Sequence, residues 1–173
     1  MALAGDPGRA TAADQQVARG KLEDELRGLD ERLQSMLDAY EENPSVIDSG
    51  LLNVTGCAVD VKAAITDAYR IMKIQVYAED SPLRTDHDVW PAFVEQKDEF
   101  IGFYKSALTA LEIYREVLRT YSLMKTDAEP GPQRGDLKRI QQDKQVQVAE
   151  RAGCIEAVSD FHEKFSAMLT ILR

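Results

Sequence analysis

The sequence IDSGLLNVTGCAVDVKAAITDAYRIMKIQV, residues 47–76, carries the most regular apolar pattern in the chain. Its apolar side chains recur at steps of four and three residues, which places them on one face of an α-helix. Neighbouring apolar residues such as Val59 and Ile71 widen this stripe, so we expect contact with more than one other helix. The stripe predicts one long helix over residues 45–79. Its members are Ile47, Leu51, Val54, Ala58, Val61, Ile65, Ala68, Met72 and Val76.

Proline and polar side chains mark the boundaries of this helix. Asn43-Pro44 ends a preceding helix, because proline disfavours the α conformation in the residue before it and lacks a backbone donor. Ser45 and Asp48 are spaced like a capping box, which predicts that the next helix begins at once. Residues 80–88 (DSPLRTDHD) have no apolar period and contain a proline, so they predict a connection.

The same periodicity predicts three further helices, over residues 16–42, 89–126 and 136–173. Residues 127–135 hold two prolines and two glycines and predict the loop before the last helix. The first half of that helix, 137–151, is rich in Gln, Lys and Arg, so we expect it to be exposed or to pair with polar groups. The three stripes are Leu22, Leu26, Leu29, Leu33, Met36 and Tyr40; Phe93, Phe100, Tyr104, Ala107, Leu111, Tyr114, Leu118 and Tyr121; and Cys154, Val158, Phe161, Phe165, Met168 and Leu172.

Four helices of similar length joined by short connections predict an all-α fold, an up-down-up-down four-helix bundle of long helices. Residues 1–15 lack an apolar period and predict a flexible leader, so residues 16–173 form the single helical-bundle domain. Periodicity also allows two long hairpins whose core is completed by dimerisation. A chain of 173 residues suffices for one core of this kind.

The chain is acidic, with 30 Asp and Glu against 21 Lys and Arg and a net charge of -9. This charge disfavours nucleic acid and membrane surfaces as partners, since both are anionic. No apolar run approaches the roughly 20 residues that cross a bilayer, so we expect no transmembrane segment. Cys57 and Cys154 lie far apart and are expected to be buried free thiols, which suits a reducing, cytoplasmic location. A redox pair between them across the bundle is the alternative.

No set of residues in the sequence predicts a catalytic, cofactor or metal site. A di-metal carboxylate bundle needs Glu-x-x-His pairs, and neither His87 nor His162 has a glutamate three residues before it. We expect His87 to be solvated in its loop and His162 to be half-buried beside the apolar stripe of the last helix. A Gly-rich phosphate loop and a nucleophile elbow are also absent from the sequence.

Two surfaces are predicted to bind a partner. Leu83, Trp90 and Phe93 gather near the start of the third long helix and form either a hydrophobic docking site or a cluster that seals the core. The polar first half of the last helix offers the second surface, and its candidate contact residues are Lys138, Gln142 and Gln145.

Long helices with broad stripes, an acidic surface and no assembled catalytic set predict a non-enzymatic helical protein–protein interaction module. An adaptor, assembly subunit, chaperone or inhibitor would fit, with another protein or a second copy of the chain as its partner. The alternative is a helical-bundle enzyme or small-ligand binder whose inter-helix pocket is lined by Tyr104, Tyr114 and His162.

Overall fold

The computed structural model describes residues 12–51, 61–127 and 134–172, with the backbone alone for 49–50, 121–127 and 134–143. Within these ranges all regular structure is helical, which confirms the predicted all-α class. There are five α-helices of unequal length in place of four similar ones: α1 (Ala12–Glu42), α2 (Val46–Leu51), α3 (Val61–Ile71), α4 (Trp90–Asp127) and α5 (Arg134–Leu169). A π-helical turn and two 3-10 turns complete the structure: η1 (Met72–Val76), η2 (Pro82–Thr85) and η3 (Thr170–Leu172).

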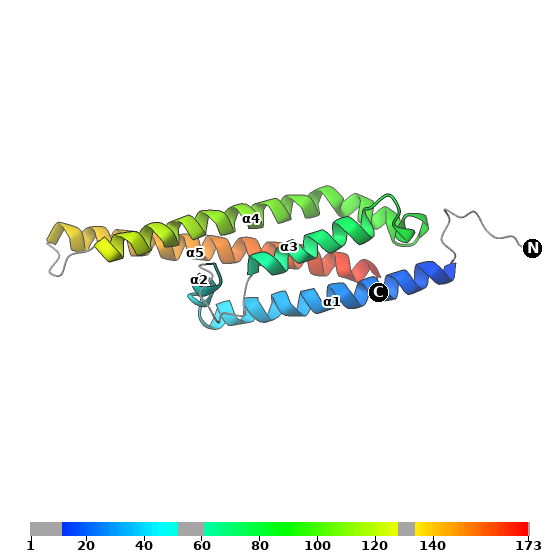
Figure 1. The fold of residues 1–173 in the computed structure, drawn as a ribbon, viewed down its shortest axis with the longest axis horizontal. Helices are drawn as coiled ribbons and strands as arrows, with labels where there is room; N and C mark the ends of the chain where they lie inside the picture. The colour runs from blue at the N-terminus through cyan, green and yellow to red at the C-terminus, as the bar shows by residue number, and fades with distance from the viewer. Residues whose placement is uncertain (1–11, 52–60, 128–133, 173) are drawn as a thin grey trace, which may run out of the picture.

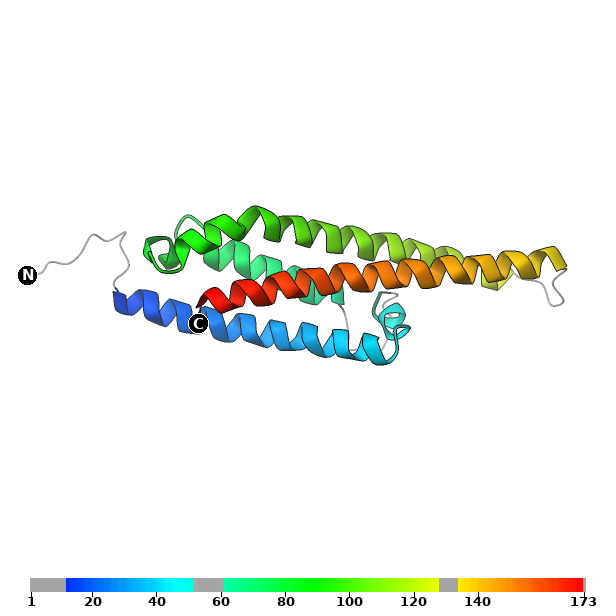
Figure 2. The same cartoon turned by 180° about the vertical axis from the view of Figure 1, so that it is seen from behind.

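The longest helices, α4 and α5, run antiparallel as a hairpin (Figure 1). α1 and α3 lie along the half of the hairpin that holds the start of α4 and the end of α5. The short helix α2 lies next to the end of α1. Past α2 the hairpin continues beyond α1, α2 and α3, and the same is seen from behind in Figure 2. The molecule is therefore thick at one end, and a helix pair projects from the other.

α1 begins at Ala12, so residues 12–15 are helical and do not belong to the predicted leader. Residues 1–11 lie outside the described part of the chain. The expected stripe packs inward: five of its six members are buried, and Leu29 is partly buried against the core. The C-terminal end of the chain returns to this helix, where Arg19 Nη2 donates to the carbonyl of Leu172 at 3.4 Å.

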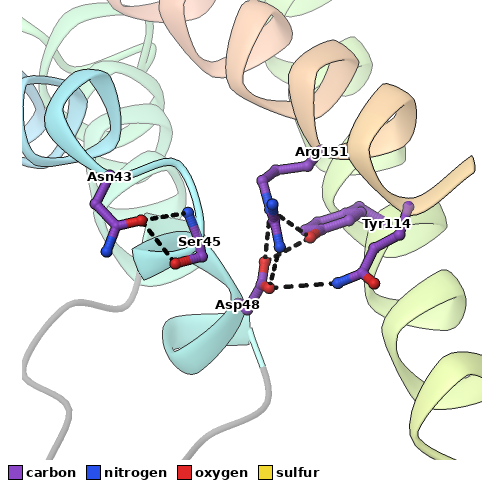
Figure 3. A network of polar contacts seen from close by, with 6 residues as sticks. Asn43, Ser45, Asp48, Tyr114 and Arg151 are labelled. Atoms are coloured by element: carbon purple, nitrogen blue, oxygen red, sulfur yellow. Dashed lines mark hydrogen bonds and ion pairs between the residues drawn. The ribbon is translucent and has the colours of Figure 1, made fainter. Parts of the chain in front are cut away.

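α2 begins at Val46, directly after Ser45, as predicted, but the predicted capping box is not formed. The Ser45 hydroxyl donates to Asn43 Oδ1 at 2.7 Å. Asn43 Oδ1 also accepts from the Ser45 amide at 3.3 Å, which closes the turn (Figure 3). The Asp48 side chain points away from this turn, toward α4 and α5, where it binds Arg151.

Of the helix predicted over 45–79, the structure describes α2 and α3, followed by η1, and the residues that join α2 to α3 lie outside the described ranges. Residues 52–60 are not described, so the expected burial of Val54 and Ala58 is untested. Every other member of the stripe is buried. In η1 the Tyr77 amide donates to the carbonyl of Met72, five residues earlier, at 3.0 Å. The stripe takes two successive steps of four residues here, and the wider π turn keeps Met72 and Val76 in the core.

The connection before α4 is held by hydrogen bonds to the backbone. Tyr77 Oη donates to the carbonyl of Phe93 at 2.7 Å, and Ser81 Oγ donates to that of Gln75 at 2.7 Å. At the start of α4 the nearby polar acceptor is Asp86: its Oδ1 accepts from the Asp88 amide at 3.0 Å. Pro91 lies in the first turn of α4, where backbone donors have no partner within the helix.

Aromatic side chains fill the core between α3, α4 and α5. Phe100 of α4 packs against Phe161 of α5 with ring centroids 5.5 Å apart. Tyr69 of α3 stacks on Tyr104 of α4 at 3.9 Å. All six members of the last predicted stripe are buried, five on α5 and Leu172 in η3. This packing fixes the hairpin in place along the thick end of the molecule.

Candidate functional site

The most concentrated group of polar contacts lies where α2 meets the hairpin, at the boundary between the thick end and the projecting part (Figures 1 and 3). Its centre is the carboxylate of Asp48. Arg151 of α5 donates to it twice, from Nη2 to Oδ2 at 2.6 Å and from Nε to Oδ1 at 3.2 Å. Tyr114 Oη of α4 donates to Oδ1 at 2.5 Å, and Gln147 Nε2 of α5 lies 3.5 Å from Oδ2. One carboxylate thus joins three helices.

This cluster is largely withdrawn from water. The Asp48 and Arg151 side chains are 20% and 16% exposed, and Tyr114 is buried. The hydrogen bonds that Arg151 donates to Asp48 raise the pKa of Arg151, so the guanidinium stays charged. Burial, and then the hydrogen bond to Asp48, raise the pKa of the Tyr114 hydroxyl, which remains a donor. The arrangement is a carboxylate held by a cation and by neutral donors.

The sequence contains a signal for this site in two polar residues that continue the buried face of α5. Counting back from Cys154 in steps of three and four, the buried face of α5 continues through Arg151 and Gln147. Polar residues at core positions require partners, because a buried charge or amide without one is costly. The spacing of Ser45 and Asp48 predicts a helix cap, so the sequence did not identify Asp48 as the partner of Gln147 and Arg151.

A second polar cluster joins α1 to α5. His162 Nε2 lies 3.0 Å from Asp30 Oδ1 and 3.3 Å from Ser166 Oγ, and the Ser166 hydroxyl donates to the same carboxylate oxygen. A Ser-His-Asp triad needs a histidine that contacts the hydroxyl through one ring nitrogen and the carboxylate through the other. Here Nε2 faces both groups. This geometry links two helices but does not prepare a nucleophile. His162 is buried, more deeply than expected, and His87 is exposed as predicted.

The predicted residues near the start of α4 belong mainly to the core. Leu83 and Phe93 are 1% and 0% exposed, so a partner cannot reach them in this conformation. Trp90 is partly buried, with its ring 6.1 Å from that of Tyr77 and the Arg84 guanidinium 5.1 Å above it. These positions favour a cluster that seals the core over a hydrophobic docking site. Trp90 alone of the three retains accessible surface.

The predicted residues of the last helix lie on the projecting part of α5. Gln145 is exposed, and Lys138 and Gln142 lie on α5 where only the backbone is described. Nearby Val146 and Val148 are 53% and 59% exposed. The expectation of an exposed or polar-paired half helix is therefore confirmed for residues 144–151, where Gln147 and Arg151 face Asp48.

Of the two cysteines, Cys154 lies in the described part of the chain. Cys154 is a buried free thiol, as predicted, whereas Cys57 lies outside the described residues. Burial, with a further contribution from the charge of Asp48, raises the pKa of the Cys154 thiol to about 12. Such a thiol is protonated near neutral pH and is a poor nucleophile there.

Over the described ranges, no group of three or more His, Cys, Asp or Glu side chains is placed to hold a metal ion. None of the described helices is both long and apolar enough to cross a membrane. Comparisons of the chain with protein-family models, with curated proteins and with solved structures found no match.

Proposed function

We propose that the chain is a non-enzymatic helical protein–protein interaction module that binds a helix of its partner along the projecting part of the α4–α5 hairpin. This part, the hairpin end, comprises residues 115–127 and 134–150. In the proposal α1, α3, α4 and α5 form the up-down-up-down four-helix bundle that holds the hairpin. The partner is another protein in a reducing compartment such as the cytoplasm, and the chain serves it as adaptor, assembly subunit, chaperone or inhibitor.

The observation that carries the proposal is the projection of α4 and α5 past the other described helices (Figures 1 and 2). Paired helices bury one face against each other, and in a bundle their remaining apolar positions pack on further helices. Val146 and Val148 are exposed on α5 in this region. The two valines are two residues apart and point to opposite sides of α5, so a partner helix laid against the hairpin end would cover one of them.

The hairpin end differs from the rest of the chain in the sign of its net charge. It carries seven Lys and Arg against five Asp and Glu, a net charge of +2, whereas the whole chain carries -9 and the remaining residues therefore -11. An acidic partner helix would be attracted to this end and repelled elsewhere. Complementary charge of this kind favours encounter in one orientation.

The test is partner capture with matched variants. The wild-type chain is immobilised, proteins retained from the native cell extract are identified, and the affinity of the purified partner is measured by titration. Val146→Asp with Val148→Asp should weaken binding by at least about tenfold, since a charge would then face an apolar contact. Trp90→Ala tests the second predicted surface in the same assay.

Val94 provides the control. It is exposed to the same degree as Val146, 51% against 53%, but lies in the first turns of α4 at the opposite end of the hairpin. Val94→Asp should leave the affinity unchanged. Equal loss in the Val94 variant and the hairpin variant, with circular dichroism unchanged in both, would remove the hairpin end as the binding surface.

A further inference from the structure

The donors around Asp48 belong to the hairpin and are connected to one another without it. Arg151 Nε donates to Tyr114 Oη at 2.9 Å, which links α5 to α4 directly. Gln147 lies one helical turn before Arg151, on the same face of α5. Three donor side chains therefore converge from two long helices on one point, and in this structure that point is occupied by a carboxylate.

The carboxylate comes from the shortest α-helix in the described chain. α2 has six residues, and a helix of this length is not stable without tertiary contacts. Ile47 and Leu51 anchor it, and both are buried in the core. Asp48 lies between them in sequence and reaches the hairpin (Figure 3). This site therefore accepts a pattern of three residues. The pattern is an apolar residue, an aspartate directly after it, and a second apolar residue three positions after the aspartate.

The position of α2 limits how much of the hairpin it covers. It lies at the start of the projecting part, and α4 and α5 continue beyond it (Figure 1). A longer amphipathic helix with the same three residues could make the contacts of α2 and also cover the exposed Val146. Such a helix would add apolar contact with Val146 to the contacts that α2 makes.

We propose that Tyr114, Gln147 and Arg151 form a carboxylate-binding site for a partner helix, and that α2 occupies this site in the unbound chain. The partner is an amphipathic helix with an aspartate in the place of Asp48 and apolar residues in the places of Ile47 and Leu51. Binding displaces α2, so the chain's own Asp48 competes with the partner. This inference rests on the proposed interaction function, because it specifies the class of partner.

A designed peptide tests the site in purified protein. The probe is an 18-residue helix-forming peptide that contains Ile-Asp-Ala-Ala-Leu, and its control has Asn in place of Asp. Fluorescence anisotropy measures binding to the wild-type chain, to Asp48→Ala and to Asp48→Ala with Arg151→Leu. The Asp48→Ala chain should bind the Asp peptide at least about tenfold more tightly than the Asn peptide, since a charged hydrogen-bonded pair is regained.

Wild type should bind the Asp peptide more weakly than Asp48→Ala does, because a tethered competitor has a high effective concentration. The double variant should not discriminate between the two peptides. Equal affinity of a folded Asp48→Ala chain for both peptides would overturn the proposal. Equal binding by wild type and Asp48→Ala would overturn the competition by α2.

Acetate provides a second measurement, and it applies even if Asp48→Ala is only partly folded. Sodium acetate should raise the melting temperature of Asp48→Ala more than sodium chloride of the same ionic strength, and should not do so for the double variant. No difference between the salts would contradict a carboxylate-binding site. Since both tests use purified chain, the site can fail them while the hairpin end still binds its partner in the capture experiment.

Discussion

At the scale of single residues, the carboxylate of Asp48 contacts three polar side chains, from Tyr114, Gln147 and Arg151. Asp48 lies on a short helix and accepts hydrogen bonds from Tyr114 and Arg151, which belong to two other helices. Arg151 is mostly buried, so it depends on this partner for its charge to be tolerated. The sequence predicted that Tyr114 faces inward, but it could not show which acid would meet Arg151. That pairing depends on where α2 lies, and a local pattern does not contain this information.

We predict that Asp48→Ala lowers the free energy of unfolding by about 3 kcal/mol, because it leaves the Arg151 guanidinium without its anion in a site with little water. Urea denaturation followed by circular dichroism measures this loss. The control is Asp67→Ala, which removes an acid of the exposed pairs with Arg32 and Arg70 and should cost less than about 1 kcal/mol. Similar losses in the two variants would contradict the buried role of Asp48.

The Cys154 thiol gives a prediction on pH. Its pKa is about 12 in the folded chain and about 8.5 when unfolded. Above pH 8.5 the unfolded thiol loses its proton while the folded thiol retains it, so stability falls as the pH rises toward 12. The raised pKa of Tyr114 adds a loss of the same sign above about pH 10.

The measurement compares two chains that both carry Cys57→Ser, one with Cys154 and one with Cys154→Ala. Urea denaturation between about pH 7 and pH 10 should show a steeper decline of unfolding free energy in the chain that keeps Cys154. Parallel declines would mean that this thiol is not shielded in the folded state.

At the scale of helices, periodicity predicted burial well and did not predict the π turn. All described members of the stripe in residues 47–76 are buried, because an apolar period reports directly which face is covered. The stripe predicts a regular α-helix up to residue 79, whereas α3 is followed by the π turn η1. A π turn differs from an α turn by one residue in its hydrogen bonds, and the apolar spacing that accompanies it also fits an α-helix.

Glycines within helices give a prediction at the same scale. Sequence alone leaves open whether Gly28 and Gly102 permit close helix crossings. A Cβ built at either position meets no atom within 4 Å, so neither glycine is required for packing. Gly28→Ala and Gly102→Ala should each raise the free energy of unfolding by about 0.5–1 kcal/mol through helix propensity. A destabilised variant in urea denaturation would show that a neighbouring helix lies closer than the structure places it.

At the scale of the whole molecule, unequal helix lengths create the candidate surface. Similar predicted lengths favoured a bundle covered along its full length, but α1 and α3 are shorter than α4 and α5. The hairpin therefore extends past the other described helices (Figures 1 and 2). The polar composition of residues 137–151 indicated this exposure, because a helix half without an apolar stripe has little to bury. How far the hairpin projects depends on where the other helices end, which the composition of that segment does not reveal.

Hydrogen–deuterium exchange of the chain with and without its purified partner tests the central claim most directly, since it reports every segment in one experiment. We predict slower exchange in residues 115–127 and 134–150 on binding, and faster exchange in α2 as it is displaced from Arg151. Slower exchange confined to residues 82–95, with α2 and the hairpin end unchanged, would contradict the account.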